Sequence, residues 1–329
     1  MAAGVGLLAF ILHQTDIRAL WAQTLQVGWL GMGVVLCVYA SSFVCDAAGW
    51  QLTLRSVPLN TRWLRRLFLV RMVGEAYNHA TPLAGVGGEP IKAVLLKKHY
   101  GLDYGESSAS LVLAKTTTLL ALVAFLATGL LQLIGDSRVP RPDKSVATIG
   151  LIALGTGIVL FFLVQRFSFS STTVHHLSRG RVGERLARRL HSALHTVRDV
   201  DQRLVDFYTQ RQARFAAAVA LGFANWFLGV LEVYVAMRFL GHPIAFTDAW
   251  IIEATAQLVR AGTFFIPASI GAQEGAFLLI CTSLTGNPVL GVALALVRRV
   301  REVLWMLSGM SLGWAYSLRP AYSETANAR

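Results

Sequence analysis

Two short stretches decide the fold: Pro82-Leu-Ala-Gly-Val-Gly-Gly-Glu89 and Pro267-Ala-Ser-Ile-Gly-Ala-Gln-Glu274. Each reads proline, six residues and glutamate, and each lies inside an apolar region, near residues 64–98 and 249–285. Proline and glycine interrupt helices. A break within an apolar region is typical of a re-entrant membrane element, which is tolerated where it lines a cavity or is buried in protein. Both stretches therefore predict re-entrant hairpins.

The 329-residue sequence as a whole has the composition of an integral membrane protein. Hydrophobic residues make up 54%, charged residues only 15%, and the mean hydropathy is +0.53, whereas soluble domains carry about 25% charged residues. An ordinary soluble enzyme, a disordered chain and a coiled coil are therefore excluded. The net charge of +12 indicates cytoplasmic loops facing anionic headgroups, so we expect no nucleic-acid partner. The cysteines lie in apolar runs, so we expect neither a metal site nor a disulfide.

Apolar runs of bilayer length predict about six full spans. A span takes about 20 residues, and five runs fit that length: 27–50, 109–134, 146–165, 215–240 and 288–318. The shorter run 1–12 has no charged region before it, so we expect a shortened first span and not a signal peptide. The predicted fold class is an all-α polytopic membrane protein, in which six full spans and two re-entrant hairpins form a single transmembrane domain over residues 1–329.

The distribution of lysine and arginine predicts the orientation. Segment 51–66 holds four arginines, segment 90–105 three lysines and segment 166–214 ten arginines, whereas other loops, such as 13–26, are poor in basic residues. The three basic segments are expected on the cytoplasmic side. Because two of them flank the first broken region, its hairpin is expected to enter and leave from the cytoplasm. We expect a multi-pass protein of the bacterial inner membrane with cytoplasmic N- and C-termini.

Segment 166–214 is a long polar insertion. Over residues 182–208, apolar side chains recur every three, four or seven positions between arginines, which predicts a basic amphipathic helix. Two interpretations remain open for this helix. It packs on the protein's own cytoplasmic face, or it lies on anionic lipid.

The two broken regions belong to a larger internal repeat. After each break a long apolar helix carries a cation, Lys115 in the first copy and Arg298 in the second. The predicted repeats cover about residues 1–135 and 146–318. Three full crossings in each unit invert the second copy, so the second hairpin is expected to enter from outside. Inverted repeats whose broken helices meet at the midplane are typical of transporters.

The first hairpin and the helix after it contain eight candidate binding residues. Glycines allow close backbone approach, and a helix that begins at the break has free N–H groups that suit an anion. Unpaired charge at this depth costs roughly 2.5 kcal/mol or more, so we expect Glu89 to pair with Lys115. For Asn78 a purely structural role in the turn is favoured. The candidates are Glu75, Asn78, Pro82, Gly85, Gly88, Glu89, Lys92 and Lys115.

The second hairpin and the last span contain the corresponding residues. Glu274 is the counterpart of Glu89 and is expected to pair with Arg298. Glu253 and Arg260 lie on one helical face, where a pair that only holds the helix in place is the simpler interpretation. The candidates are Gln257, Arg260, Pro267, Gly271, Glu274, Arg298 and Arg301.

Four charges within five residues, 298–302, cannot all face one cavity. Arg298, Arg301 and Glu302 share a helical face, whereas Arg299 is expected to point elsewhere, toward a lipid headgroup. Arginine suits phosphate through bidentate hydrogen bonding. No catalytic motif is found: a Walker loop, HExxH, GxSxG and a dinucleotide fingerprint are all missing from the sequence. We therefore expect no catalytic residues, no cofactor and no enzymatic activity.

These segments resemble the transmembrane, flippase-like domain of the lysylphosphatidylglycerol synthase family. The likeness extends from about residue 5 to 318 and rests on Gly74-Glu75 through Glu89-Pro90-Ile-Lys92 and on the Pro267 stretch. It is greatest for stand-alone members associated with hopanoid biosynthesis (the HpnL type). In full-length relatives this domain moves a lipid between leaflets, and a separate cytoplasmic domain makes the aminoacyl lipid. The resemblance therefore implies lipid translocation and argues against synthesis.

We expect a translocase for a phospholipid or related polar lipid with an anionic or zwitterionic headgroup. Its expected partners are membrane lipids, with lipid-biosynthesis enzymes as further candidates. Two alternatives remain open. One is a scaffold for a lipid-synthesis complex, for which Lys115 and Arg298 would be dispensable. The other is a membrane-embedded enzyme acting on a lipid headgroup, which would need a nucleophile or a metal cluster.

Overall fold

The computed structural model describes residues 17–80, 87–168, 207, 209–263, 266 and 269–318. Within this part the regular secondary structure is entirely helical, which confirms the all-α class. The helices are α2 (Ile17–Gln26), α3 (Gly28–Thr53), α4 (Thr61–Ala80), α5 (Gly88–Tyr100), α6 (Tyr104–Gly135), α7 (Arg141–Ser168), α10 (Gln212–Phe239), α11 (Phe246–Gly262), α12 (Ala272–Thr285) and α13 (Pro288–Ser317). The run 1–12, the predicted helix 182–208 apart from Phe207, and the candidates Pro82, Gly85 and Pro267 lie outside the described residues.

The five long apolar runs each correspond to one helix, namely α3, α6, α7, α10 and α13. Among the described helices, α3, α6 and α10 are long and apolar enough to cross a membrane, and α7 contains a shorter apolar segment, Lys144–Gly157. Helix α13 has 30 residues, but charged side chains interrupt its apolar character at positions 298–302. The architecture is that of an all-α membrane protein, whereas the number of six spans stays a prediction.

Helix α2 corrects one expectation. The sequence predicts a loop over 13–26, but Ile17–Gln26 are helical. Leu20 is buried in the largest hydrophobic core, and Gln23 Nε2 donates a hydrogen bond to the carbonyl oxygen of Leu240, 3.0 Å away. These contacts come from a segment more than 200 residues later, so the local sequence gives no sign of them.

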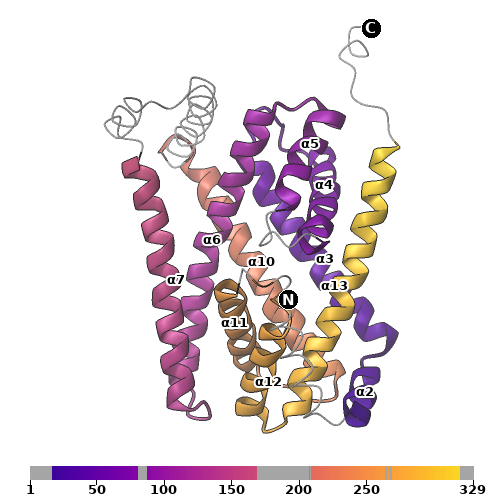
Figure 1. The fold of residues 1–329 in the computed structure, drawn as a ribbon, viewed down its shortest axis with the longest axis vertical. Helices are drawn as coiled ribbons and strands as arrows, with labels where there is room; N and C mark the ends of the chain where they lie inside the picture. The colour runs from indigo at the N-terminus through magenta and orange to yellow at the C-terminus, as the bar shows by residue number, and fades with distance from the viewer. Residues whose placement is uncertain are drawn as a thin grey trace, which may run out of the picture.

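The two predicted hairpins are pairs of helices at opposite ends of the bundle, and in the first pair only α5 is short, since α4 has 20 residues. Helices α4 and α5 pack together in the upper half of Figure 1, and α11 and α12 pack together in the lower half. Helices α5, α11 and α12 have 13, 17 and 14 residues. At 1.5 Å per residue they are too short to cross a hydrocarbon core of about 30 Å. This is the placement expected of hairpins that enter from opposite sides.

Some contacts between the two halves of the chain have a comparable counterpart under the predicted repeat, whereas that of α6 with α10 corresponds only to a much less extensive contact of α3 with α13. The most extensive contact joins α3 and α10. Helix α4 packs on α13 as α11 packs on α6, and α2 packs on α13 as α7 packs on α6. In each of these contacts a helix of one half packs against a helix of the other half. Repeats related by a twofold axis require this, with α3–α6 corresponding to α10–α13. The inverted repeat stays a prediction.

Two exposed tryptophans mark opposite ends of the bundle. Trp29, in the first turn of α3, is 95% exposed, and Trp314, in the last turn of α13, is 72% exposed. Helix α3 begins in the lower half of Figure 1, just above α2, and α13 ends at the upper end. Tryptophan is enriched at both membrane–water interfaces. We therefore expect the long axis of the bundle to be the direction that crosses the membrane.

Arg138, in the turn between α6 and α7, ties this turn to the second hairpin. Its Nη2 lies 2.5 Å from Asp248 Oδ1 and 2.6 Å from Asp136 Oδ2, and its Nη1 donates to the carbonyl oxygen of Leu284 (3.4 Å). The hydrogen bond from Arg138 holds the pKa of Asp136 below its ordinary value of 3.8. The link therefore stabilises the fold above that pH, and its contribution is lost as the pH falls through the lowered pKa.

We expect Asp136→Asn to destabilise the protein at neutral pH by ~0.2–1 kcal/mol, a small effect because Arg138 is half exposed and solvent screens the pair. The difference from the wild type should narrow as the pH falls through the lowered pKa of Asp136 and should close below it, where the wild-type carboxylate is protonated as well. Thermal unfolding followed by circular dichroism across this range measures the difference. If the stability difference between the variant and the wild type is unchanged at acid pH, the stabilising role of the Asp136–Arg138 pair is contradicted.

Candidate functional site

The densest group of buried charges surrounds the middle of α13. We call it the arginine cluster; its members are Glu232, Glu253, Glu274, Arg298, Arg299, Arg301 and Glu302. Arg298 Nη2 lies 2.5 Å from Glu253 Oε2, and Arg298 Nε lies 3.3 Å from Glu232 Oε1. Arg301 pairs with Glu232 through Nη1, and its Nη2 lies 3.5 Å from Glu302 Oε1. Arg298 and Arg301 are each 4% exposed, so carboxylates from three helices neutralise them away from solvent.

The predicted pair of Glu274 with Arg298 is wrong, because Glu274 pairs with Arg299. Arg299 Nε lies 2.6 Å from Glu274 Oε1, and Arg299 Nη1 lies 2.8 Å from Glu302 Oε2. Neighbouring residues on a helix point about 100° apart, so only one of the two arginines faces α12. The expectation that Arg299 points away from the charged group is wrong for the same reason.

The other candidates of the second hairpin hold the backbone or the carboxylates in place. Gln257 Nε2 donates to Glu253 Oε1 at 2.7 Å. Gly271 has φ of 83°, a value that favours glycine, and its N–H donates to Glu274 Oε2 at 2.7 Å. Arg260 is half-buried near the end of α11, and Glu253 pairs with Arg298 instead of Arg260.

The charges of the first hairpin form a separate group, which we call the first-hairpin cluster: Asp46, Arg71, Glu75, Asn78, Glu89, Lys92 and Lys115. Arg71 of α4 pairs with Asp46 of α3. The predicted pair of Glu89 with Lys115 is wrong, because Glu89 Oε1 lies 2.8 Å from Lys92 Nζ, one turn along the same helix. Among the described residues no ion pair involves Lys115.

Asn78 and Gly88 join the two helices of the first hairpin. The Gly88 N–H donates to Asn78 Oδ1 at 2.6 Å, and Asn78 Nδ2 donates to Glu75 Oε2 at 3.3 Å. A Cβ atom at Gly88 would collide with the backbone carbonyl of Gly74. Gly88 is thus needed for close approach of α5 to α4, and Asn78 has the structural role that the sequence favours.

Lys115 lines a small polar cavity of about 70 Å³ within the first-hairpin cluster. The charged side chains in its wall are Asp46, Arg71, Glu75, Glu89, Lys92 and Lys115. Counted at neutral pH, these are three acids and three bases. The structure therefore brings together all the described charged candidates of the first hairpin, around a space that holds only a few water molecules.

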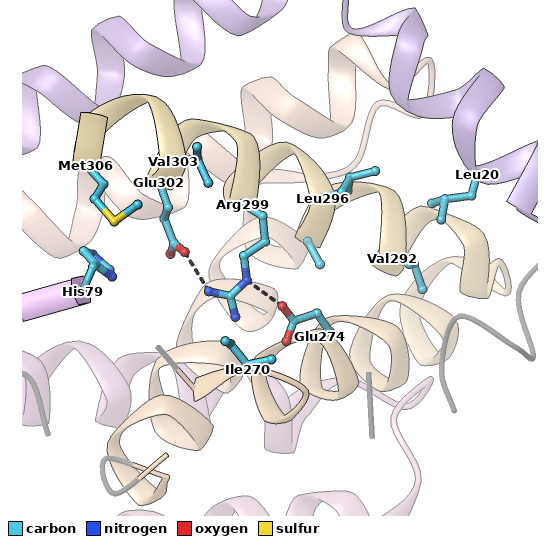
Figure 2. A pocket seen from close by; sticks show the side chains of 11 residues that line it. Leu20, His79, Ile270, Glu274, Val292, Leu296, Arg299, Glu302, Val303 and Met306 are labelled. Atoms are coloured by element: carbon cyan, nitrogen blue, oxygen red, sulfur yellow. Dashed lines mark hydrogen bonds and ion pairs between the residues drawn. The ribbon is translucent and has the colours of Figure 1, made fainter. Parts of the chain in front are cut away.

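A second, larger cavity of about 420 Å³ lies along the face of α13 that carries Arg299 (Figure 2). Its wall is apolar apart from one patch made by His79, Glu274, Arg299 and Glu302. The apolar part is formed by Leu20, Ile270, Val292, Ala295, Leu296, Val303 and Met306. The volume falls within the ~300–1,000 Å³ of small-molecule sites. We call this space the large cavity; it has the amphipathic lining that a lipid requires.

Sequence reasoning missed Asp46, Glu232 and the role of Arg299 in the large cavity. Asp46 is the one acid within the apolar run 27–50, and Glu232 the one acid within 215–240. A lone charge inside a span is by itself a signal of function or pairing, so both were detectable. The cavity wall was not, because it combines α2, α4, α12 and α13.

Within the described residues, no group of three or more histidine, cysteine, aspartate or glutamate side chains is placed to hold a metal ion. The arrangement instead offers a cation bracketed by two carboxylates, open to an apolar space. Arg299 is 24% exposed in its side chain, against 5% for Arg298 and Arg301. Arg299 is therefore the arginine of the cluster that a molecule in the large cavity meets.

Comparison with known proteins gives one family and two relatives. The family described as "Lysylphosphatidylglycerol synthase TM region" matches residues 1–309. A UPF0104 membrane protein of Methanothermobacter thermautotrophicus is 24% identical over 276 residues, which cover 80% of this chain and 78% of that protein. A UPF0104 membrane protein of Pyrococcus horikoshii is 20% identical over 255 residues, 73% of each chain. No solved structure matches the chain.

Proposed function

The chain belongs to the lysylphosphatidylglycerol synthase TM-region family, and from this premise we propose that it moves a polar lipid between the leaflets of its membrane. The observation that carries the proposal is the large cavity, which combines a charged patch with an apolar wall inside a membrane protein. Small-molecule sites place a few polar groups in a mostly apolar pocket to fix orientation. A lipid has the same division into a polar headgroup and apolar tails.

The headgroup would lie against Arg299 and the tails along α13. The Arg299 guanidinium is suited to a phosphate, which it can bind through two parallel hydrogen bonds. Glu274 and Glu302, which pair with Arg299, would be displaced from it or would bind a cationic part of the headgroup. Leu296 and Val292 extend the cavity away from Arg299 toward Leu20 (Figure 2) and would contact the tail.

The first-hairpin cluster would receive the headgroup at the other end of its path. Lys115 lines the polar cavity and has no ion pair among the described residues, so it can attract an anion. In this proposal α3–α6 and α10–α13 act as inverted repeats, and each repeat exposes its charges to one side of the membrane. Sequence and packing support such a scheme through the paired Pro–Glu stretches and the matching helix contacts.

The proposed location is the inner, or plasma, membrane, with both termini in the cytoplasm. Support comes from exposed basic residues at the upper end of the bundle, on the α3–α4 loop, α4 and α5: Arg55, Arg62, Arg65, Lys97 and Lys98. Basic residues favour the cytoplasmic side and anionic lipid. Within this proposal the protein is a transporter and not an enzyme, and hopanoid-related lipids and lipid-biosynthesis enzymes are candidate substrate and partners.

Transbilayer movement of labelled phosphatidylglycerol in proteoliposomes tests the proposal. We expect the wild-type protein to speed this movement, and Leu296→Trp to slow it by about tenfold or more, equal to ~1.4 kcal/mol, because the indole fills the large cavity. Leu307→Trp is the matched control, since Leu307 is 53% exposed on the same helix and is not part of the cavity wall. A folded wild-type protein that moves no lipid, or a Leu296→Trp variant that matches Leu307→Trp, contradicts the proposal.

A further inference from the structure

The end of α4 separates the two cavities. Glu75 lines the polar cavity of the first-hairpin cluster, and His79, one helical turn later, lines the large cavity. The two side chains are in contact, with 3.5 Å between His79 Nε2 and Glu75 Oε1, and both are largely covered by protein. His79 was not among the candidates of the sequence analysis. It is the one histidine in the described wall of either cavity.

His79 also faces the charged patch of the large cavity. In Figure 2 the Glu302 carboxylate lies between Arg299 and His79. Arg299 Nη1 lies 2.8 Å from Glu302 Oε2, so Glu302 holds the arginine on one side and has His79 on the other. Histidine changes its charge near physiological pH more readily than any other side chain. A proton on His79 would therefore place a second cation next to the carboxylate that now binds Arg299.

We propose that His79 is a proton-binding site that controls how strongly the large cavity binds a phosphate-bearing headgroup; this inference rests on the proposed function. With neutral His79, the patch holds Glu274, Glu302 and Arg299, a net charge of −1. One proton on the imidazole brings the patch to zero. The imidazolium then shares Glu302, and Arg299 is freer to bind the phosphate. Proton uptake and headgroup binding consequently favour each other.

Several other charged or titratable groups lie near His79. The elements packed against α4 are α3, α5 and α13. These helices, α4 itself, α6 and the end of α11 contribute the following titratable or charged groups near this end of α4: Tyr39, Asp46, Arg71, Glu75, Tyr77, Glu89, Lys92, Lys115, Arg260, Arg299, Arg301 and Glu302. His79 is the imidazole among these groups, the type of side chain whose charge changes near physiological pH, and Glu75 contacts its ring.

The test measures phosphatidylglycerol movement in proteoliposomes with equal pH on both sides, between about pH 5 and 8. We expect the wild-type rate to rise about tenfold on acidification. His79→Gln should stay at the alkaline rate throughout, and His79→Lys, with a permanent charge, should stay at the acid rate. His242→Gln is the matched control, because His242 is exposed in the loop after α10; it should keep the wild-type profile.

Titration calorimetry with short-chain phosphatidylglycerol provides a second readout that does not depend on transport. Measured at neutral pH in two buffers of different ionisation enthalpy, binding to the wild type should take up close to one proton, and binding to His79→Gln none. If His79→Gln moves lipid with the wild-type pH profile, the proton site is wrong and the translocase stands. If lipid binds with proton uptake but is not moved, the translocase is wrong and the proton site stands. Absence of proton uptake in the wild type overturns the inference directly.

Discussion

Replacing Arg298 with alanine is expected to destabilise the protein by about 3–5 kcal/mol, because the change leaves a buried carboxylate without its cation. Glu253 is 1% exposed, and its Oε2 lies 2.5 Å from Arg298 Nη2. Glu232 keeps Arg301 as a partner, so most of the penalty arises at Glu253. Folded proteins are stable by only about 5–15 kcal/mol. Unfolding in a denaturant, followed by tryptophan fluorescence in detergent micelles, measures the loss.

Two further variants test whether the stability loss comes from breaking the buried ion pair or would follow from removing any arginine. Arg62→Ala removes an exposed arginine from the start of α4 and should change stability by no more than about 0.5 kcal/mol. Arg298→Met combined with Glu253→Gln removes both charges and should recover much of the loss, since neutral replacements of buried pairs are often tolerated. If Arg298→Ala and Arg62→Ala have equal effects, the buried network does not stabilise the fold as described.

Gly88→Ala is the second change with a large expected effect, a loss of about 1–3 kcal/mol or more from overpacking. The added Cβ would collide with the Gly74 carbonyl, and rigid backbone stands on both sides of the contact. Helices α4 and α5 must then separate, which breaks the 2.6 Å hydrogen bond from the Gly88 N–H to Asn78. We expect a lower unfolding temperature and faster proteolysis at the first hairpin.

Gly33→Ala is the matched control for this prediction. Gly33 lies inside α3, and a Cβ there would meet no atom within 4 Å. In a helix interior alanine is favoured over glycine by about 1 kcal/mol, so this variant should be neutral or more stable. The two glycine variants are thus expected to have effects of opposite sign. Equal effects would mean that the close approach of α4 and α5 does not limit stability.

The long helices and the hairpins could be predicted from sequence because their signals are local. Runs of apolar residues set α3, α6, α7, α10 and α13, and proline and glycine mark the breaks between α4 and α5 and between α11 and α12. Hydropathy over a window of about 20 residues reports span length directly. Helix α2 has ten residues and depends on contacts with α13 and with Leu240, which follows α10, and so the sequence predicts a loop there.

Ion pairing was the weaker part of the prediction because it depends on how helices are rotated against one another. The sequence places Arg298 and Arg299 at the same depth, and only the packing of α12 on α13 decides that Glu274 meets Arg299. A shift of one residue turns a side chain by about 100°. Glu89 is similar, since Lys92 on its own helix is nearer than Lys115. His79 gave no signal in its sequence context; its position between two cavities is a property of the assembled bundle.

The order of charges along the chain has a consequence for biosynthesis. Three of the four carboxylates that pair with the arginines of α13 come from α10, α11 and α12, and all three helices are made before α13. The fourth, Glu302, lies on α13 itself. One arginine at the centre of a membrane helix costs roughly 2.5–3.5 kcal/mol on insertion scales, and α13 carries three. The hydrophobicity of α13 alone therefore provides little free energy for its insertion into the bilayer. We therefore expect α13 to enter the bilayer last, after the helices that carry its partner glutamates are in place.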